Sequence, residues 1–144
     1  KDHGFMPVVV EAVPEEEYNA WVAEQRAAAE TERQLTEKDW TLDELMERGE
    51  KAYASACASC HQPDGSGMPP AFPALKGSQI ALEDMDAHMD VVVNGVSGTA
   101  MQAFGSQLSE VDLAAVITYE RNAWGNNTGE MVTPKEIFDY KNQE

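Results

Sequence analysis

The stretch Cys57-Ala58-Ser59-Cys60-His61 decides what this chain folds around. It uses both cysteines of the 144-residue sequence, separated by two residues and followed directly by a histidine. One helical turn can present both thiols to the vinyl groups of a haem, while the adjacent imidazole reaches the iron. The spacing therefore predicts one covalently bound haem c, attached through Cys57 and Cys60, with His61 as the proximal iron ligand.

Three other interpretations of this pentapeptide are weaker. A thioredoxin-like redox pair belongs beside a β-α-β pattern, and no such alternation surrounds Cys57. A structural zinc site needs four ligands, whereas the remaining histidines, His3 and His88, are far apart in the sequence. Chance occurrence is disfavoured by the helix and loops that flank the motif.

The composition limits the partners of the chain. Lysine and arginine number 10 against 26 acidic residues, which gives a formal net charge of -16, and two haem propionates would make it more negative. Nucleic acid is therefore excluded as a partner. The charge fits an electron donor with a basic docking patch, and it fits a merely solvated acidic surface equally well.

Length and hydropathy bound the organisation. The chain can hold one domain and a tail, has no stretch approaching the roughly 20 apolar residues that span a bilayer, and opens with no secretory signal. As given, it is expected to be soluble. Four segments are expected. Residues 1–22 hold a β-prone run bounded by prolines and then a short helix-like stretch, and residues 23–40 form a solvated helical or flexible linker. Residues 41–125 form the compact domain, and residues 126–144 form a polar tail that packs only in part.

The compact domain begins with Thr41-Leu42-Asp43-Glu44, a capping-box sequence that predicts the start of a helix. Small and apolar residues then recur at helical spacing up to Cys57, so this helix delivers the haem-attachment segment. Gly49 lies within that stripe. Glycine inside a helix costs about 1 kcal/mol relative to alanine, so Gly49 either marks the close approach of another helix or is an ordinary tolerated glycine.

Three further segments follow the motif. Residues 62–78 contain so many glycines and prolines that they predict a loop. Residues 83–93 predict a helix that ends at Asn94-Gly95, with a loop over 96–105 after it. Ser109 opens the last long helix, whose wide apolar face predicts packing on two sides and which ends near Trp124.

This order of elements resembles class I c-type cytochromes from residue 41 to about 125. The resemblance implies an all-α class I cytochrome c fold, with three to four helices around one covalent haem c. It also implies that the first and last helices cross near the haem edge, with Gly49 and Tyr53 against Tyr119 or its neighbours.

The sixth iron ligand is chosen among a methionine, a histidine and water. Met101 follows a helix and a glycine-containing turn, 40 residues after His61, as the distal methionine of the family does. Met68, seven residues after His61 in the glycine- and proline-rich loop, is the reserve. Gln102 stands where many members have proline. The other methionines in the helices, Met46, Met85 and Met89, are expected in the core, and Met131 in the tail.

Two further residues of the haem surroundings are expected. His88 offers bis-histidine ligation as an alternative, although a helical histidine facing a propionate or solvent is the preferred interpretation. The resemblance also implies that a proline carbonyl of the loop accepts a hydrogen bond from His61 Nδ1, and Pro70 is the candidate.

The N-terminus carries a second resemblance. Lys1-Asp2-His3-Gly4-Phe5-Met6-Pro7-Val8-Val9-Val10 is similar to the end of the dinuclear copper domain of cytochrome c oxidase subunit II. His3 and Met6 would then be copper ligands only in an intact parent domain, because the bridging cysteines are expected before Lys1. We therefore expect this chain to be an excised fragment. Without the resemblance, both residues would be interpreted as solvated tail residues.

Both resemblances together imply the fused, caa-type form of subunit II. The expected function is a haem c domain that relays single electrons from a donor to the copper centre for oxygen reduction, without a catalytic site of its own. Its partners would be the other oxidase subunits and the copper domain, in a membrane-anchored parent on the periplasmic side. The alternatives are a free-standing periplasmic cytochrome, a thiol-disulfide enzyme, and a haem-based gas sensor.

Overall fold

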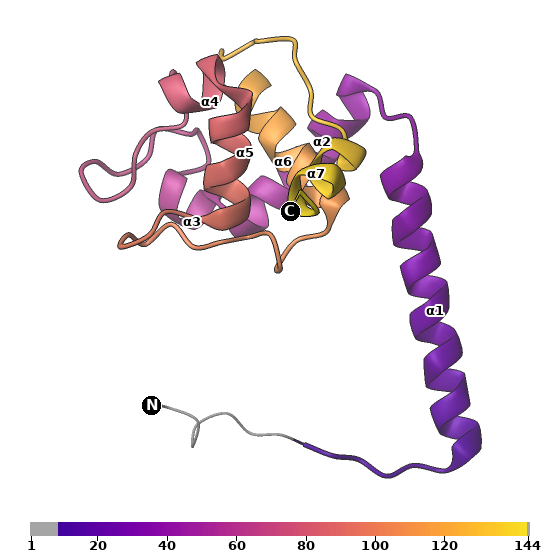
Figure 1. Ribbon diagram of the computed structural model, residues 1–144. Coiled ribbons are helices and arrows are strands. Elements are labelled where there is room, and N and C mark those ends of the chain that lie inside the picture. Colours follow the sequence, from indigo (N-terminus) through magenta and orange to yellow (C-terminus); the bar gives the residue numbers. More distant parts are fainter. Residues whose placement is uncertain (1–8, 144) are drawn as a thin grey trace. The chain divides into compact units, whose positions relative to one another are not determined.

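A computed structural model describes residues 9–143 of the chain. All regular secondary structure within these residues is helical, which confirms the predicted all-α class (Figure 1). The chain divides into two units, Lys1–Thr31 and Glu32–Glu144. The second unit contains the haem-attachment motif.

The first long helix, α1 (Glu15–Glu37), is a solvated element. Three glutamates occupy its first turn, where the positive end of the helix dipole stabilises them, and none of its residues is buried. The short helix and the linker predicted on either side of residue 22 are thus one continuous helix. Residues 9–14 of the β-prone run carry no regular structure, since a strand needs a partner. None of the helices described combines the length and hydropathy needed to cross a membrane.

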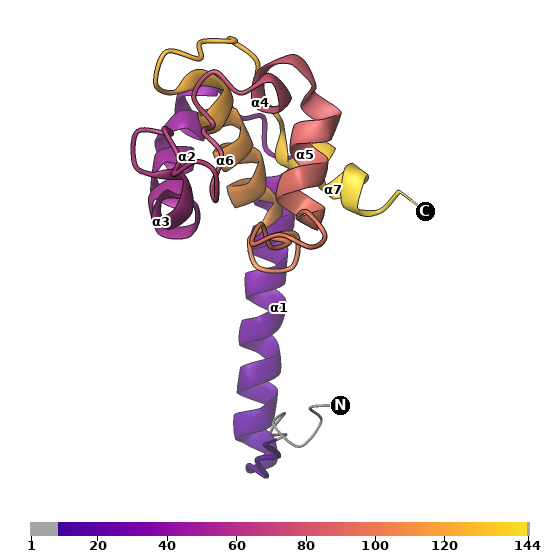
Figure 2. The same cartoon turned by 90° about the vertical axis from the view of Figure 1, so that its left-hand side faces the viewer.

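The frame of the second unit is the crossing of α2 (Leu42–Ala56) and α6 (Glu110–Asn122). Thr41 caps α2 as predicted: Glu44 N donates to Thr41 Oγ1 at 3.3 Å, and Thr41 N donates to Glu44 Oε2 at 2.9 Å. The helices lie side by side in both ribbon views (Figures 1 and 2). Tyr53 and Tyr119 meet at the crossing with ring centroids 5.6 Å apart, which confirms the predicted arrangement.

The helix predicted over 83–93 is α5 (Met85–Asn94), and a further short helix that was not predicted, α4 (Gln79–Glu83), precedes it. The break falls at Asp84, whose extended backbone lets its side chain accept a hydrogen bond from Ala87 N at 2.9 Å and cap α5. Gly95 ends α5 with φ at +71° and ψ at -171°, a positive-φ conformation that suits glycine but is not the left-handed helical cap predicted for that position.

The polar tail is more ordered than its composition suggested. Residues 134–141 form α7 (Pro134–Lys141), which packs on α6 and begins with its own capping box at Thr133. Val132 and Ile137 are 2% and 0% exposed and belong to the core. The compact unit therefore extends past residue 125. The apolar residues of this segment are few and interrupted by polar ones, which gives too little periodicity to reveal this packing.

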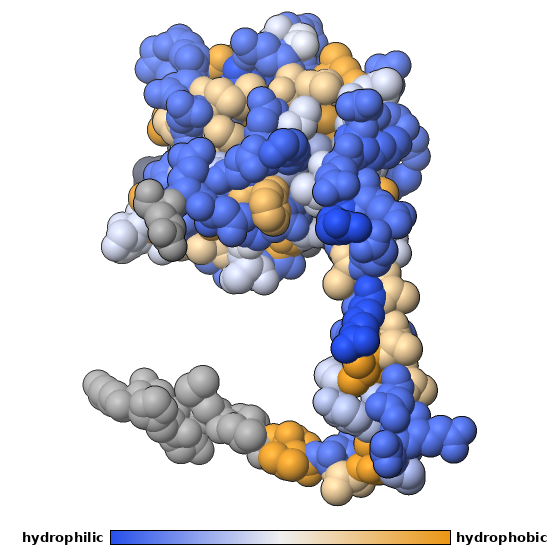
Figure 3. Space-filling model, turned by 45° about the vertical axis from the view of Figure 1, so that its right-hand side comes forward, coloured by the Kyte–Doolittle hydropathy of each residue, from blue (hydrophilic) through white to orange (hydrophobic). Residues whose placement is uncertain are grey.

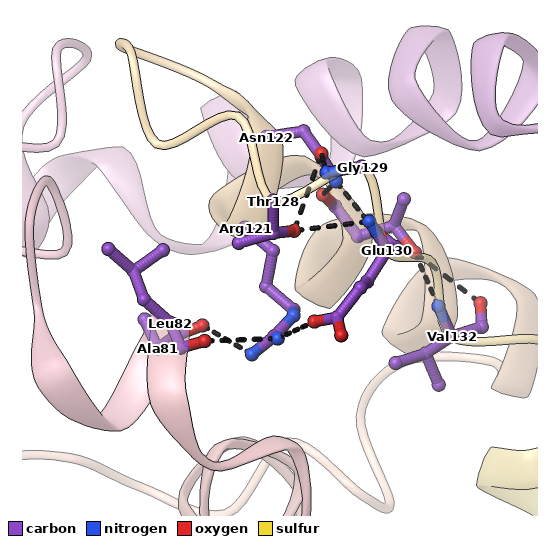
Figure 4. Close-up of polar contacts among 9 residues, drawn as sticks. Ala81, Leu82, Arg121, Asn122, Thr128, Gly129, Glu130 and Val132 are labelled. Atoms are coloured by element: carbon purple, nitrogen blue, oxygen red, sulfur yellow. Dashed lines mark hydrogen bonds and ion pairs between the residues drawn. The ribbon is translucent and has the colours of Figure 1, made fainter.

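Arg121 joins the C-terminal segment to the rest of the unit (Figure 4). This buried side chain donates to the carbonyl oxygens of Ala81 and Leu82 at 2.6 and 3.2 Å and forms an ion pair with Glu130. Val132 N donates to Thr118 Oγ1 at 3.0 Å, which adds a second link to α6. The surface of the unit is mostly hydrophilic on the face shown in Figure 3, as the charge predicts.

Candidate haem-attachment site

The attachment segment follows α2 without a loop. Cys57 ends α2, and the next four residues form a single helical turn, α3 (Ala58–His61). Cys60 N and His61 N both donate to the Cys57 carbonyl, at 3.1 and 3.0 Å. The cysteines and the histidine are thus held on one turn, the placement that thioether formation to one porphyrin requires.

Both cysteines are free thiols. Burial, followed by the charge of Glu120 and a hydrogen bond to it, raises the pKa of the Cys57 thiol well above its ordinary value. Glu120 extends from α6, so this helix contributes directly to the surroundings of the first attachment residue.

His61 is oriented by the loop that follows it. Its Nδ1 lies 2.9 Å from the carbonyl oxygen of Pro73, and His61 itself is 9% exposed. A carbonyl oxygen can only accept, so Nδ1 carries the proton and Nε2 is the atom left for a metal. The hydrogen bond that the resemblance implies, from His61 Nδ1 to the carbonyl of a proline in the loop, is therefore present.

The residue expected to make this contact, Pro70, does not make it. Pro70 lies inside a tight turn closed by Met68 and Phe72, where Met68 N donates to Phe72 O at 2.8 Å. Pro73 follows that turn and packs on Gly67, where a Cβ would lie 2.5 Å from the Pro73 oxygen. The acceptor is thus selected by the path of the loop, which the sequence alone does not specify.

The two methionine candidates differ in their surroundings. Met101 is partly buried and packs against the core cluster, as does Cys57. Its loop is held to α5, because Phe104 N donates to the Val92 carbonyl at 3.1 Å and Gly105 N donates to the Val93 carbonyl at 3.0 Å. Met68 is 43% exposed. The structure thus brings Met101, rather than Met68, to the core that also receives the attachment segment.

His88 was expected to face a haem propionate or solvent, and its burial is inconsistent with the solvent-facing alternative. It is 2% exposed on α5, and its Nε2 lies 2.7 Å from Oε2 of Glu120. Its Nδ1 is buried with no hydrogen-bond partner. Glu120 was missed as part of the site, although its position three residues after Ile117, on the apolar side of α6, is a signal that could have revealed it.

The residues present fit a covalent haem. Two free thiols and one imidazole with a fixed tautomer share a single turn, and a thioether donor lies in the loop that follows α5. Thiols, imidazole and thioether are the groups that attach and ligate haem c. His3 and Met6, the candidate copper ligands, lie outside the described residues.

Comparison with known families supports this chemistry. A family profile described as "Cytochrome C oxidase, cbb3-type, subunit III" matches residues 44–119, just over half of the chain. The matched region runs from the first turn of α2 into the last turn of α6 and includes Cys57, Cys60, His61 and Met101.

Several characterised proteins are similar over the same region. The cytochrome c subunit of alcohol dehydrogenase (quinone) from Gluconobacter oxydans (strain 621H) is 31% identical over 99 residues, which cover 62% of this chain and 21% of that protein. The cytochrome c subunit of gluconate 2-dehydrogenase from Pantoea cypripedii is 28% identical over 122 residues, covering 77% and 27%. Cytochrome c-552 of Thermus thermophilus is 33% identical over 91 residues, covering 54% and 69%. The chain thus spans about a fifth of the alcohol dehydrogenase subunit but over two thirds of cytochrome c-552.

Proposed function

Because this chain belongs to the cytochrome c family described as cytochrome c oxidase, cbb3-type, subunit III, we infer that it is a haem c domain that transfers single electrons. The observation that carries the proposal is the single turn that holds Cys57, Cys60 and His61, with His61 Nδ1 fixed on the Pro73 carbonyl. When bound, haem supplies reversible one-electron chemistry at its iron.

The chain's own residues would anchor, ligate and shield that group. Cys57 and Cys60 form the thioethers, and Nε2 of His61 is the proximal ligand. Met101 is the proposed distal ligand, because its loop packs against the core while Met68 is 43% exposed. Histidine and methionine together leave no position for oxygen or substrate, so the domain relays electrons and has no catalytic site of its own.

We propose further that the domain is part of a caa-type oxidase subunit II. The support is the copper-domain pattern at residues 1–10, with His3 and Met6 as ligands in the intact parent, and the solvated helix α1, which suits a spacer between two domains. In that assembly the haem domain passes electrons to the dinuclear copper centre on the extracytoplasmic side of the membrane. The donor would carry a basic patch that complements the charge of -16.

A free-standing electron carrier is the second candidate. The similarity to cytochrome c-552 favours it, because the match covers 69% of that protein. Two observations distinguish the proposals: the coding sequence that surrounds this chain, and the copper content of the protein that it encodes. Two copper ions per haem would support the oxidase subunit. A product that contains haem alone, from a frame without the upstream cysteines, would support the carrier.

The first experiment is an absorption spectrum of the oxidised and reduced protein after maturation with haem. We expect a low-spin c-type spectrum with a methionine-to-iron charge-transfer band that Met101→Ala abolishes and Met68→Ala retains. Loss of the band in Met68→Ala alone would transfer the ligand role to Met68. A high-spin protein that binds carbon monoxide rapidly would favour a gas sensor, and a haem-free protein a thiol-disulfide enzyme.

A further inference from the structure

We propose that Asn126 and Trp124, both beyond the end of α6, are positioning residues that set the hydrogen bond from His61 to Pro73 and thereby the reduction potential of the bound haem. The inference rests on the proposed function, because it takes His61 as an iron ligand. Neither residue belongs to the attachment motif or to the expected ligand set. Their contacts with the loop between His61 and α4 carry the argument.

Asn126 ties the far end of this loop to α6. Its Oδ1 accepts a hydrogen bond from Gly77 N at 2.9 Å, and its Nδ2 donates to the Leu75 carbonyl at 3.3 Å. The same Nδ2 donates to the Glu120 carbonyl at 2.6 Å. One amide side chain therefore fixes residues 75–77, just after Pro73, to the last turn of α6.

Trp124 ties down the near end of the loop. Its Nε1 donates to the Pro63 carbonyl at 3.1 Å. Its ring covers Gly65, where a Cβ would lie 2.4 Å from the ring carbon Cε3. Trp124 also packs on the buried ring of Tyr53, with centroids 4.8 Å apart. The beginning of the loop is thus anchored on the α2–α6 crossing.

The loop itself connects these two anchors to Pro73. Gly65 O accepts hydrogen bonds from Leu75 N and Lys76 N at 2.9 and 3.0 Å, which join the near end to the far end. Gly67 N donates to the His61 carbonyl at 2.9 Å. Pro73 lies between these fixed points, so its carbonyl position follows from the two anchors.

The backbone around the anchors is held in a costly conformation. Trp124 and Asn127 have φ angles of +56° and +50°, in the left-handed region that residues with side chains seldom adopt. Such conformations persist where the surrounding contacts determine them, and they concentrate at functional sites. At this turn the contacts are those that Trp124 and Asn126 make with the loop between His61 and α4.

The direction in which the reduction potential should change follows from the hydrogen bond of the His61 imidazole. A hydrogen bond from Nδ1 makes the imidazole a more basic ligand, and a more basic ligand stabilises the oxidised iron over the reduced iron. Loosening the loop would weaken this bond. The reduction potential should therefore rise when an anchor is removed.

Asn122 provides a matched control. It also lies at the end of α6, and its amide also joins that helix to a following segment: Nδ2 donates to the Thr118 and Glu130 carbonyls, both at 2.8 Å, and Oδ1 accepts from Gly129 N at 2.8 Å (Figure 4). None of these three bonds reaches the loop between His61 and α4. Asn122→Ala therefore removes a comparable set of hydrogen bonds, which includes a longer one from Thr128 Oγ1 at 3.5 Å, without touching the contacts that hold Pro73.

The test compares the midpoint potential and the exchange of the His61 Nδ1 proton in the haem-loaded wild type, Asn126→Ala and Asn122→Ala. For Asn126→Ala we expect the equilibrium constant for reduction to rise about threefold, roughly 30 mV for one electron, with faster proton exchange. Asn122→Ala should leave both quantities at the wild-type values. If Asn126→Ala fails to fold, Trp124→Phe keeps the ring, removes the donor to Pro63 and should shift the potential in the same direction.

The outcomes separate this inference from the proposed function. A wild type with a normal haem spectrum and equal potentials in the three proteins overturns the role of Asn126 and leaves electron transfer standing. A wild type without covalent haem overturns the proposed function and this inference together. An unchanged potential in Trp124→Phe, where it replaces Asn126→Ala, also overturns the inference.

Discussion

Gly49 of α2 and Ala115 of α6 lie in backbone contact. A Cβ on Gly49 would come within 2.2 Å of the Ala115 carbonyl oxygen and within 2.6 Å of Tyr119 Cβ. These distances are below van der Waals contact, and one of the atoms belongs to a helix backbone. The two helices can therefore approach this closely only if position 49 has no side chain.

Gly49→Ala should destabilise the domain despite the better helix propensity of alanine. Relieving the overlap requires α2 and α6 to separate, and overpacking of this kind costs about 1–3 kcal/mol. Urea unfolding of the haem-loaded protein measures the loss. Ala54→Ser, which adds one atom on the exposed side of the same helix, should stay within about 0.5 kcal/mol. Equal stability of the two variants would show that the crossing is looser than described.

The buried pair of His88 and Glu120 predicts strong coupling between α5 and α6. The side chains are 3% and 4% exposed, with Nε2 and Oε2 2.7 Å apart. Glu120→Leu should cost about 1–3 kcal/mol, because it leaves the buried imidazole without its hydrogen-bond partner. The double variant His88→Leu/Glu120→Leu should recover most of this loss.

An exposed ion pair serves as the control for the His88 and Glu120 variants. Lys135 and Asp139 of α7 are 66% and 51% exposed at a separation of 2.8 Å. Asp139→Ala should change the free energy of unfolding by less than about 1 kcal/mol. If the losses of stability in His88→Leu and Glu120→Leu simply added up in the double variant, that would contradict an energetic link between His88 and Glu120.

The C-terminal helix should be part of the cooperative unit. Ile137 is 0% exposed, whereas its neighbour Phe138 is 48% exposed. Ile137→Ala should lower the free energy of unfolding by about 2–5 kcal/mol, the usual cost of a large-to-small change in a core. Phe138→Ala, the larger deletion, should have the smaller effect. The reverse order would mean that α7 does not pack on α6 in solution.

The start of α2 should contribute an acid-sensitive part of the stability. A hydrogen bond from Lys38, followed by those from the Thr41 backbone and side chain, lowers the pKa of Glu44 from 4.5 to about 2. A depressed folded-state pKa stabilises the fold above the ordinary pKa, and this contribution is lost as the pH falls from about 4.5 towards 2.

The measurement is the urea midpoint at pH 7 and pH 3 for the wild type and Glu44→Gln. The wild type should lose more stability between the two pH values, because glutamine keeps the hydrogen bonds to Thr41 but does not titrate. Lys135→Gln, which removes an exposed charge on α7 and has no contact with Glu44, should leave the wild-type difference in place. An unchanged difference in Glu44→Gln would contradict the role of this carboxylate.

Several features of the site were predictable because they are local. Cys57, Cys60 and His61 lie within five consecutive residues, so helical geometry alone places them on one turn. The capping box at Thr41 and the glycine that ends α5 with a positive φ also depend on neighbours in the sequence, and both are present.

Other features depend on contacts across the fold. Pro73 rather than Pro70 accepts from His61, because the turn between Met68 and Phe72 and the absence of a side chain at Gly67 set the path of the loop. Glu120 meets His88 across 32 positions of sequence. No periodicity or spacing encodes such pairs, since they arise only when α5 and α6 pack together.

By itself, the sequence determined the chemistry of this protein: a c-type haem-attachment turn on an all-α frame, with strong acidic charge around it. The tertiary structure decided which distant groups support that turn, namely the Pro73 carbonyl, the Glu120 carboxylate and the anchors Trp124 and Asn126. The reason is physical. Bonds within one helical turn are fixed by the backbone, whereas the partners of a buried polar group are fixed by how the remaining chain packs around it.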